Sequence, residues 1–209
     1  MKRQSVKRRL ALISACALAL SLTACGSEVT TPETDTQGNP WSEDWTQLWD
    51  LLGVEDPGNG FVLNDNNTAL AIKGILYASW VAGDSEEYVN EDEETVALYD
   101  AQIYLLVQGG ESEEDAASTL EEWMEIEREQ YSVTSESTYS AGGQEYSLIF
   151  YDTVNEDNPY ACGASAFTTF GVYAVYAELT CREEDFCDRQ TVLQEYLDGV
   201  HYSGLYAVE

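Results

Sequence analysis

Histidine and basic residues are scarce in this chain. Its 209 residues include one histidine, nine lysines and arginines, and 39 acidic side chains. Five of the nine basic residues precede residue 10, so the chain from residue 25 onward carries a formal charge of 4 − 39 = −35. A field of that sign repels phosphate backbones and anionic lipid headgroups. The charge argues against nucleic acid as a partner and predicts a folded body that stands away from the membrane surface.

Motifs of common enzymes and metal sites are missing as well. There is no Gly-x-Ser-x-Gly nucleophile elbow and no phosphate-binding glycine loop. His201 has no serine or cysteine at a spacing that suggests a catalytic triad. It lies at the C-terminal end of a predicted helix, where the helix dipole favours a cationic side chain, and this is a sufficient structural reason for a histidine there. Cys162, Cys181 and Cys187 lack the close pairs that zinc sites use. We expect no enzyme, no metal and no cofactor, but the many carboxylates keep a carboxylate-dependent extracellular hydrolase as an alternative.

The N-terminal segment has the pattern of an export signal. Basic residues within positions 2–9 precede an uncharged apolar run over 10–22, which is shorter than the about 20 residues of a membrane span. The run ends in Leu22-Thr23-Ala24-Cys25-Gly26, which resembles the lipobox of bacterial lipoproteins. That resemblance implies removal of the signal peptide, residues 1–24, and lipidation of Cys25 with fatty-acyl chains such as palmitate. We expect a lipid anchor in the cell membrane, on its extracytoplasmic face.

The rest of the chain divides into a tether and one domain. Residues 25–40 are rich in Thr, Pro, Gly and acids, and Val29 is their only large apolar residue, which is typical of a flexible tether. Residues 41–209 hold all 14 tyrosines and all five tryptophans, enough apolar area for a sizeable core. We therefore expect a single globular domain over 41–209.

Hydrophobic periodicity predicts an α+β domain. Helical spacing favours helices over 41–52, 112–131 and 183–202, the second of them capped by Ser112. Strands are favoured over 61–63, 69–81, 96–107, 133–139 and 144–153, with a further hairpin over 161–181. The strands over 69–81 and 96–107 should form a hairpin with an acidic tip at 84–94. We expect the aromatic residues of the strands to fill the core rather than line a groove: Tyr77, Trp80, Tyr104, Tyr173 and Tyr176.

Three cysteines remain inside the predicted domain, where export permits a disulfide. A two-residue turn at Gly171-Val172 places Cys162 directly opposite Cys181, at about 4.5 to 5.5 Å and within bridging range. Cys181 with Cys187 is the competing pair, because it would tie the strand end to the last helix. Either disulfide would stabilise the fold by about 2 to 3 kcal/mol through loop closure.

The order of elements resembles that of PsbP-like domains. Strands are followed by a central helix with Thr119-Leu120-Glu121-Glu122-Trp123, a Gly-Gly-Gln hairpin at 142–144, and a closing helix that ends in residues 196–203. The resemblance implies an α/β/α sandwich, an antiparallel sheet with helices packed on it, over roughly residues 60–203. The acidic chain with its lipobox is also similar to uncharacterised lipoproteins of Gram-positive anaerobes. PsbP-like proteins are mostly accessory or assembly proteins, which implies binding rather than catalysis.

These patterns together predict a membrane-anchored extracytoplasmic lipoprotein that acts as a binding or accessory module for a protein or glycan. The acidic tip and Asn64-Asp65-Asn66-Asn67 offer oxygen ligands, which calcium prefers. Neither segment matches an EF-hand loop, so we expect calcium binding to be weak. A calcium-stabilised surface protein is therefore a second alternative.

Overall fold

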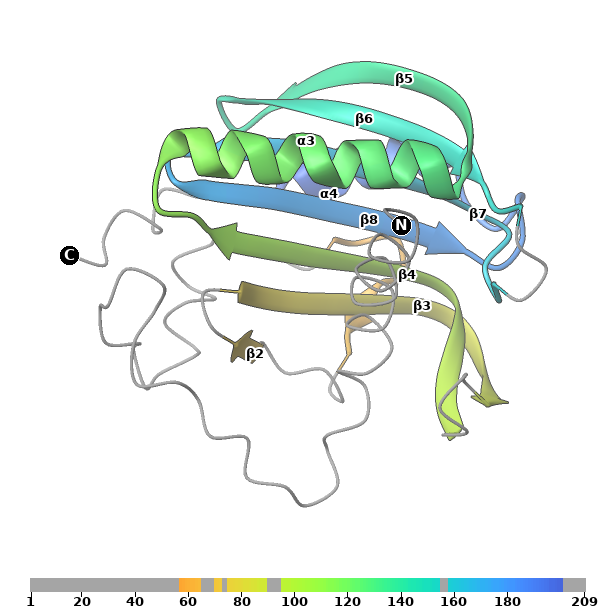
Figure 1. The fold of residues 1–209 in the computed structure, drawn as a ribbon. Helices are drawn as coiled ribbons and strands as arrows, with labels where there is room; N and C mark the ends of the chain where they lie inside the picture. Colours follow the sequence, from red (N-terminus) through yellow and green to blue (C-terminus); the bar gives the residue numbers. More distant parts are fainter. Residues whose placement is uncertain (1–56, 65–69, 73–74, 90–94, 155–157, 201–209) are drawn as a thin grey trace, which may run out of the picture.

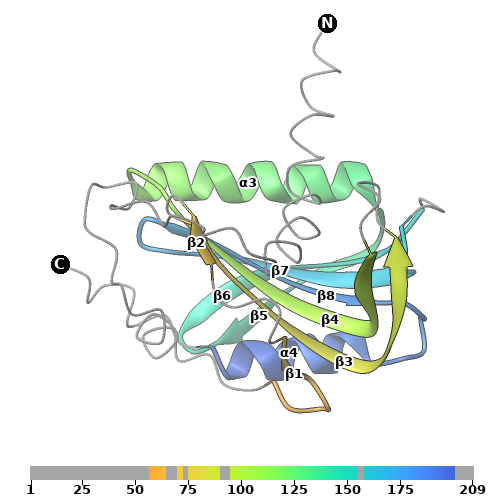
Figure 2. The same ribbon diagram turned by 90° about the horizontal axis from the view of Figure 1, so that it is seen from below.

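The described part of the protein is one antiparallel sheet with a helix on each face. The computed structural model describes residues 57–64, 70–72, 75–89, 95–154 and 158–200 (Figure 1). Helix α3 (Glu113–Gln130) and helix α4 (Arg189–Asp198) lie on opposite sides of the sheet (Figure 2). The predicted fold class, an antiparallel α+β sheet with helices packed on it, is confirmed. The predicted signal segment, the tether with Cys25, the helix over 41–52 and His201 lie outside the described residues.

The sheet has eight strands, arranged mainly as hairpins. Its order is β1-β3-β4-β8-β7-β6-β5, with β2 beside β3. Helix α3 connects β4 to β5, so the chain crosses one face of the sheet before it adds the last four strands. The strands are β1 (Val62–Leu63), β2 (Leu70–Ile72), β3 (Ile75–Val89), β4 (Thr95–Gly109), β5 (Ser132–Ala141), β6 (Gln144–Asp152), β7 (Cys162–Phe170) and β8 (Tyr173–Cys181).

One predicted strand is in fact two. The strand predicted over 69–81 was wrong as a single element, because β2 and β3 pair antiparallel with Ile72 opposite Ile75. Both halves are apolar, so periodicity gives no sign of the reversal. β3 then continues to Val89, through the first part of the predicted acidic tip. The predicted hairpin of this strand with the next one is confirmed, since β3 pairs with β4 over most of its length.

Helix α3 begins where its cap predicts. The Ser112 side chain accepts a hydrogen bond from the Asp115 backbone N–H at 3.1 Å, and three acids occupy the first turn, where the helix dipole favours negative charge. The helix ends at Gln130, because Tyr131 is already extended. Neither described helix carries an apolar run long enough to cross a bilayer.

Helix α4 is shorter than predicted. The helix predicted over 183–202 was wrong at its start, because α4 begins at Arg189. The Asp188 carboxylate caps it, accepting from the Thr191 backbone N–H at 3.3 Å and from the Thr191 hydroxyl at 2.9 Å. Phe186 lies in the predicted range at helical spacing from Leu193, but it precedes α4 and is exposed.

Alternate strand residues face the two helices and form two cores. On β8, Tyr176 packs in the cluster that contains Trp123 of α3, whereas Leu179 packs in the cluster that contains Leu193 of α4. The prediction that strand aromatics fill the core is confirmed for the three that are buried: Trp80, Tyr104 and Tyr176. Tyr173 packs partly buried against the α4 core, and the side chain of Tyr77 lies outside the description.

Candidate functional site

Two glutamates, Glu127 and Glu178, are buried between α3 and the sheet. They are only 5% and 6% exposed. The Ser165 hydroxyl donates a hydrogen bond to one carboxyl oxygen of Glu127, and the Tyr176 hydroxyl donates to the other at 3.1 Å. The Tyr151 hydroxyl donates to Glu178. Both carboxyl groups therefore bind hydroxyl groups of the protein interior in place of water.

No basic side chain neutralises this pair among the described residues. The three described arginines form ion pairs elsewhere: Arg128 with Glu136, Arg182 with Glu86 and Asp100, and Arg189 with Asp152. Burial, and next the charge of Glu178, raises the pKa of Glu127 from 4.5 to about 8. Burial also raises the pKa of Glu178, against the opposing hydrogen bonds from tyrosine hydroxyls. The pair therefore retains a proton at neutral pH.

Aromatic rings surround the two carboxyl groups. Tyr131 stacks on Tyr151 with ring centroids 4.0 Å apart, and Tyr104 meets Tyr176 edge to face at 5.4 Å. Gly163 leaves the space that the Tyr151 hydroxyl occupies, because a Cβ atom there would overlap it. This enclosure can hold a proton in a dry interior, and it keeps the carboxyl groups out of contact with solvent.

The sequence analysis missed this pair, although both residues carry a signal. Glu127 lies on the same helical stripe as Ala116, Leu120 and Trp123, which face the sheet. Glu178 is the one charged residue in the strand YAVYAELTC. A carboxylate at an apolar position of a regular pattern indicates a buried acid, but 39 acidic residues obscured these two.

A second candidate site is a two-stranded extension, residues 84–89 of β3 and 95–100 of β4, which we call the arm. β4 pairs with β8 only from Ala101 onward, whereas β3 and β4 stay paired as far as Val89 opposite Thr95. In Figures 1 and 2 these ends turn away from the rest of the sheet. Asp84 and Glu87 are exposed on the arm, so the predicted acidic tip is an ordered projection over its described part.

The arm is fixed where it leaves the sheet. The strand register shifts between Ala82 and Ser85, and Gly83 takes φ +80°, a conformation that other residues rarely adopt. Arg182, which follows β8, pairs with Asp100 at 3.3 Å and with Glu86. One arginine therefore joins the two strands of the arm to the end of the central sheet.

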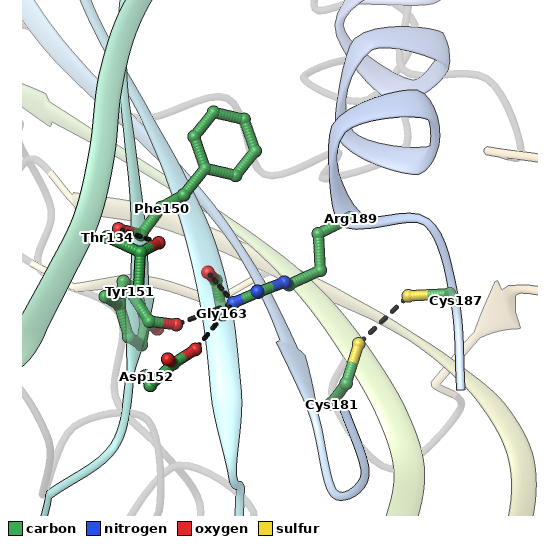
Figure 3. Close-up of polar contacts among 8 residues, drawn as sticks. All are labelled: Thr134, Phe150, Tyr151, Asp152, Gly163, Cys181, Cys187 and Arg189. Atoms are coloured by element: carbon green, nitrogen blue, oxygen red, sulfur yellow. Dashed lines mark hydrogen bonds and ion pairs between the residues drawn. The ribbon is translucent and has the colours of Figure 1, made fainter. Parts of the chain in front are cut away.

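The three cysteines of the domain come together near the start of α4. The predicted hairpin register is confirmed, because Cys162 lies opposite Cys181 and Gly171 takes φ 56° in the turn. The Cys181 sulfur also lies 3.0 Å from the Cys187 sulfur (Figure 3). All three are thiols in this structure, so both disulfide pairings remain predictions.

The proposed calcium ligands are only partly described. Asn64 is half-buried at the end of β1, where its backbone N–H donates to Ser79 at 3.0 Å, and the next three residues lie outside the described part. Within the described ranges no group of three or more His, Cys, Asp or Glu side chains is arranged to hold a metal ion. Weak calcium binding therefore remains a prediction.

The fold defines an α+β protein whose antiparallel sheet lies between two helices. No family model and no curated protein matches the chain. Among solved structures, the chain is similar to PA94 of Pseudomonas aeruginosa, a protein of unknown function described as a candidate regulator, with 11% identity and a TM-score of 0.38 over 56% of this chain and 95% of that one. It is also similar to the cyanobacterial PsbP of Synechocystis sp. PCC 6803, with 14% identity and a TM-score of 0.37 over 60% of this chain and 85% of that one.

Proposed function

We propose that this protein is a lipid-anchored extracytoplasmic module that binds a basic protein or peptide. The lipobox pattern that ends at Cys25 supports the anchor. The observation that carries the binding role is the arm, because it extends a pair of strands beyond the sheet that stabilises them. A two-stranded ribbon gains little stability on its own, so its projection is better explained by contact with a partner.

The charge of the arm sets the kind of partner. Asp84 and Glu87 are exposed, and Val89 at the end of β3 is 60% exposed. A basic partner would be steered by the negative field of the whole chain and would then cover an apolar side chain at the arm. Long-range attraction of this kind weakens as salt increases.

The buried Glu127 and Glu178 are the observation that favours the alternative of a carboxylate-dependent hydrolase. Raised carboxyl pKa values are typical of general acids. However, α3 covers both side chains, and a general acid must reach within hydrogen-bond distance of its substrate. Binding through the exposed arm needs no such opening, and we therefore propose it first.

The anchor is tested by lipid labelling. Cells that express the full chain are fed a labelled fatty acid, and the membrane fraction is compared between the natural protein and Cys25→Ser. We expect label and membrane retention only when Cys25 is present. Equal labelling of both proteins would exclude Cys25 as the lipidated residue.

Binding is tested on the full chain in detergent, by calorimetry with a lysine-rich and a glutamate-rich peptide of equal length. We expect the lysine-rich peptide alone to bind, with an affinity that falls as salt rises. The double variant D84N/E87Q should weaken binding more than E121Q/E125Q, which removes the same charge from the exposed face of α3. Equal loss in both variants would show that net charge, and not the arm, attracts the peptide.

Thermal unfolding with and without calcium tests the calcium-stabilised surface protein. A calcium-dependent rise of the unfolding midpoint that D84N/E87Q abolishes and E121Q/E125Q retains would support that alternative instead.

A further inference from the structure

The end of β8 and the start of α4 bring two thiols into contact. Cys181, the last residue of β8, is fully buried, and its sulfur lies 3.0 Å from that of Cys187. Cys187 is only partly buried. One member of the pair is therefore partly open to a solvent-borne reagent, whereas the other is buried. Figure 3 shows the contact between the two sulfur atoms.

The scaffold around this pair is fixed by Arg189, the first residue of α4. Its guanidinium donates to the Tyr151 carbonyl of β6 at 2.7 Å and to the Gly163 carbonyl of β7 at 3.2 Å (Figure 3). Cys187 lies two residues before Arg189, next to Asp188, which caps α4. The position of Cys187 relative to the sheet thus follows from contacts with two strands.

The two thiols differ in acidity. The pKa of Cys187 is lowered by the hydrogen bond from the Cys181 thiol and, more weakly, by the charge of Arg189, against burial and the charge of Asp188. The same hydrogen bond and burial raise the pKa of Cys181. Since the thiolate is the nucleophile in disulfide exchange, this difference in acidity, together with the greater exposure of Cys187, favours Cys187 as the attacking thiol.

We propose that Cys187 and Cys181 form a thiol–disulfide exchange site, with Cys187 as the attacking thiol and Cys181 as the resolving thiol. The Cys187 thiolate attacks one sulfur of an external disulfide, forms a mixed disulfide and expels one thiolate. The Cys181 thiol then loses its proton to the medium and attacks the Cys187 sulfur, which expels the second thiolate. The two protein thiols are oxidised by two electrons, and the external disulfide is reduced to two thiols.

The residues beside Cys187 define the class of disulfide. Glu183, Glu184, Asp185 and Asp188 are exposed within the same short segment, and Phe186 is 39% exposed next to the thiol. These acids outnumber the neighbouring Arg182 and Arg189, whose charges are already paired with Glu86, Asp100 and Asp152. Negative charge attracts a cationic disulfide and repels an anionic one. The substrate class is therefore a positively charged disulfide, either a small molecule or a basic segment of another protein.

Cys162 provides an internal control. It is fully buried opposite Cys181, and burial raises the pKa of its thiol. A buried thiol of this kind is a poor nucleophile towards reagents in solution. The exchange site should therefore operate without Cys162.

The test uses the full chain in detergent, with Cys16→Ser and Cys25→Ser to leave the three thiols of the domain. The reduced protein is mixed with cystamine, a dication, or with oxidised glutathione, an anion. The reaction is quenched with acid, and the disulfides are mapped by mass spectrometry. We expect a Cys181–Cys187 disulfide, formed at least about tenfold faster with cystamine at low salt, and a smaller ratio at high salt.

Single variants separate the steps. Cys181→Ser should stop the reaction at a mixed disulfide on Cys187, Cys187→Ser should abolish the fast phase, and Cys162→Ser should leave the product unchanged. Circular dichroism of each variant verifies that it is folded. The disulfide mapped in the protein that keeps all three thiols of the domain does not depend on these single variants.

Three results would overturn the proposal. They are a Cys162–Cys181 disulfide as the main product, a fast phase that persists in folded Cys187→Ser, and thiols that react only after denaturation. A preference for oxidised glutathione would reject the assigned substrate class. None of these outcomes depends on whether the arm binds a basic partner.

Discussion

The two sets of carboxylates in this protein differ in surroundings more than in chemistry. Glu127 and Glu178 lie beneath α3, where hydroxyl groups and aromatic rings replace water and no cation is near among the described residues. Asp84 and Glu87 lie on the arm, in water. The buried pair keeps a proton at neutral pH, whereas exposure lets the arm present full charges to a partner.

The difference shows that burial, and not the number of acids, determines what a carboxyl group does here. A buried acid couples the stability of the fold to pH, because its proton affinity changes on unfolding. An exposed acid contributes little to stability but acts at long range on charged partners. Four experiments examine this contrast, from the largest expected effect to the smallest.

Glu127→Gln should remove most of the pH dependence that the buried pair gives to stability. The pKa of the Glu127 carboxyl group is about 8 in the folded chain, compared with its ordinary value of 4.5, which applies in the unfolded chain. Between these two pH values the folded chain therefore binds more protons than the unfolded chain. Stability from this group is complete below pH 4.5 and is lost as the pH rises through 8. By the linkage relation the loss amounts to about 3 to 5 kcal/mol, measurable by urea unfolding at pH 5 and pH 9.

The matched control is Glu121→Gln, an exposed residue of the same helix. It should keep the pH slope of the natural protein. If Glu127→Gln and Glu121→Gln gave parallel curves, the burial of Glu127 would not be the origin of the slope.

Gly163→Ala should destabilise the fold by about 1 to 3 kcal/mol through overpacking. A Cβ atom at this position would overlap the Tyr151 hydroxyl and approach the Leu179 carbonyl oxygen to 2.8 Å. The Cζ atom of Tyr151 is nearly as close as its hydroxyl, so a double-mutant cycle with Tyr151→Ala, followed by thermal unfolding, measures how much of the loss comes from this side chain. Strict additivity of the two substitutions would contradict the assigned clash.

Arg182→Ala should loosen the arm at a small cost to the whole fold. Its partners Glu86 and Asp100 are 57% and 29% exposed, so solvent screening limits the expected loss to about 0.5 to 1 kcal/mol. Amide hydrogen exchange should speed up over 85–89 and 95–99 and stay unchanged in β7 and β8. Uniform acceleration across the sheet would mean that Arg182 supports the global fold instead.

D84N/E87Q should change stability by less than about 0.5 kcal/mol, because both side chains are exposed. The same holds for E121Q/E125Q on α3. Chemical unfolding of both variants checks this, and a large loss in the first alone would mean that the arm acids have a structural role that their exposure does not suggest.

Local patterns predicted much of the fold because they act over a few residues. Ser112 signalled the start of α3 through its cap, and the Gly171-Val172 turn gave the register that places Cys162 opposite Cys181. The start of α4 was predicted too early, because Phe186 continues the apolar helical spacing of Leu193 although Asp188, between them, is the cap. The reversal between β2 and β3 left no periodic signal, since both strands are apolar.

The sequence alone determined the export pattern, the excess of acids and the alternation that builds an antiparallel sheet, because each is written in neighbouring residues. Only the tertiary structure decided which acids are buried together, which pair of strands extends beyond the sheet, and which two thiols are in contact. Those outcomes depend on tertiary contacts: Glu127 meets Ser165, Arg182 meets Asp100, and the Cys181 sulfur meets the Cys187 sulfur. A local pattern can mark a residue such as Glu127 or Glu178 as buried, but packing selects which residue it meets.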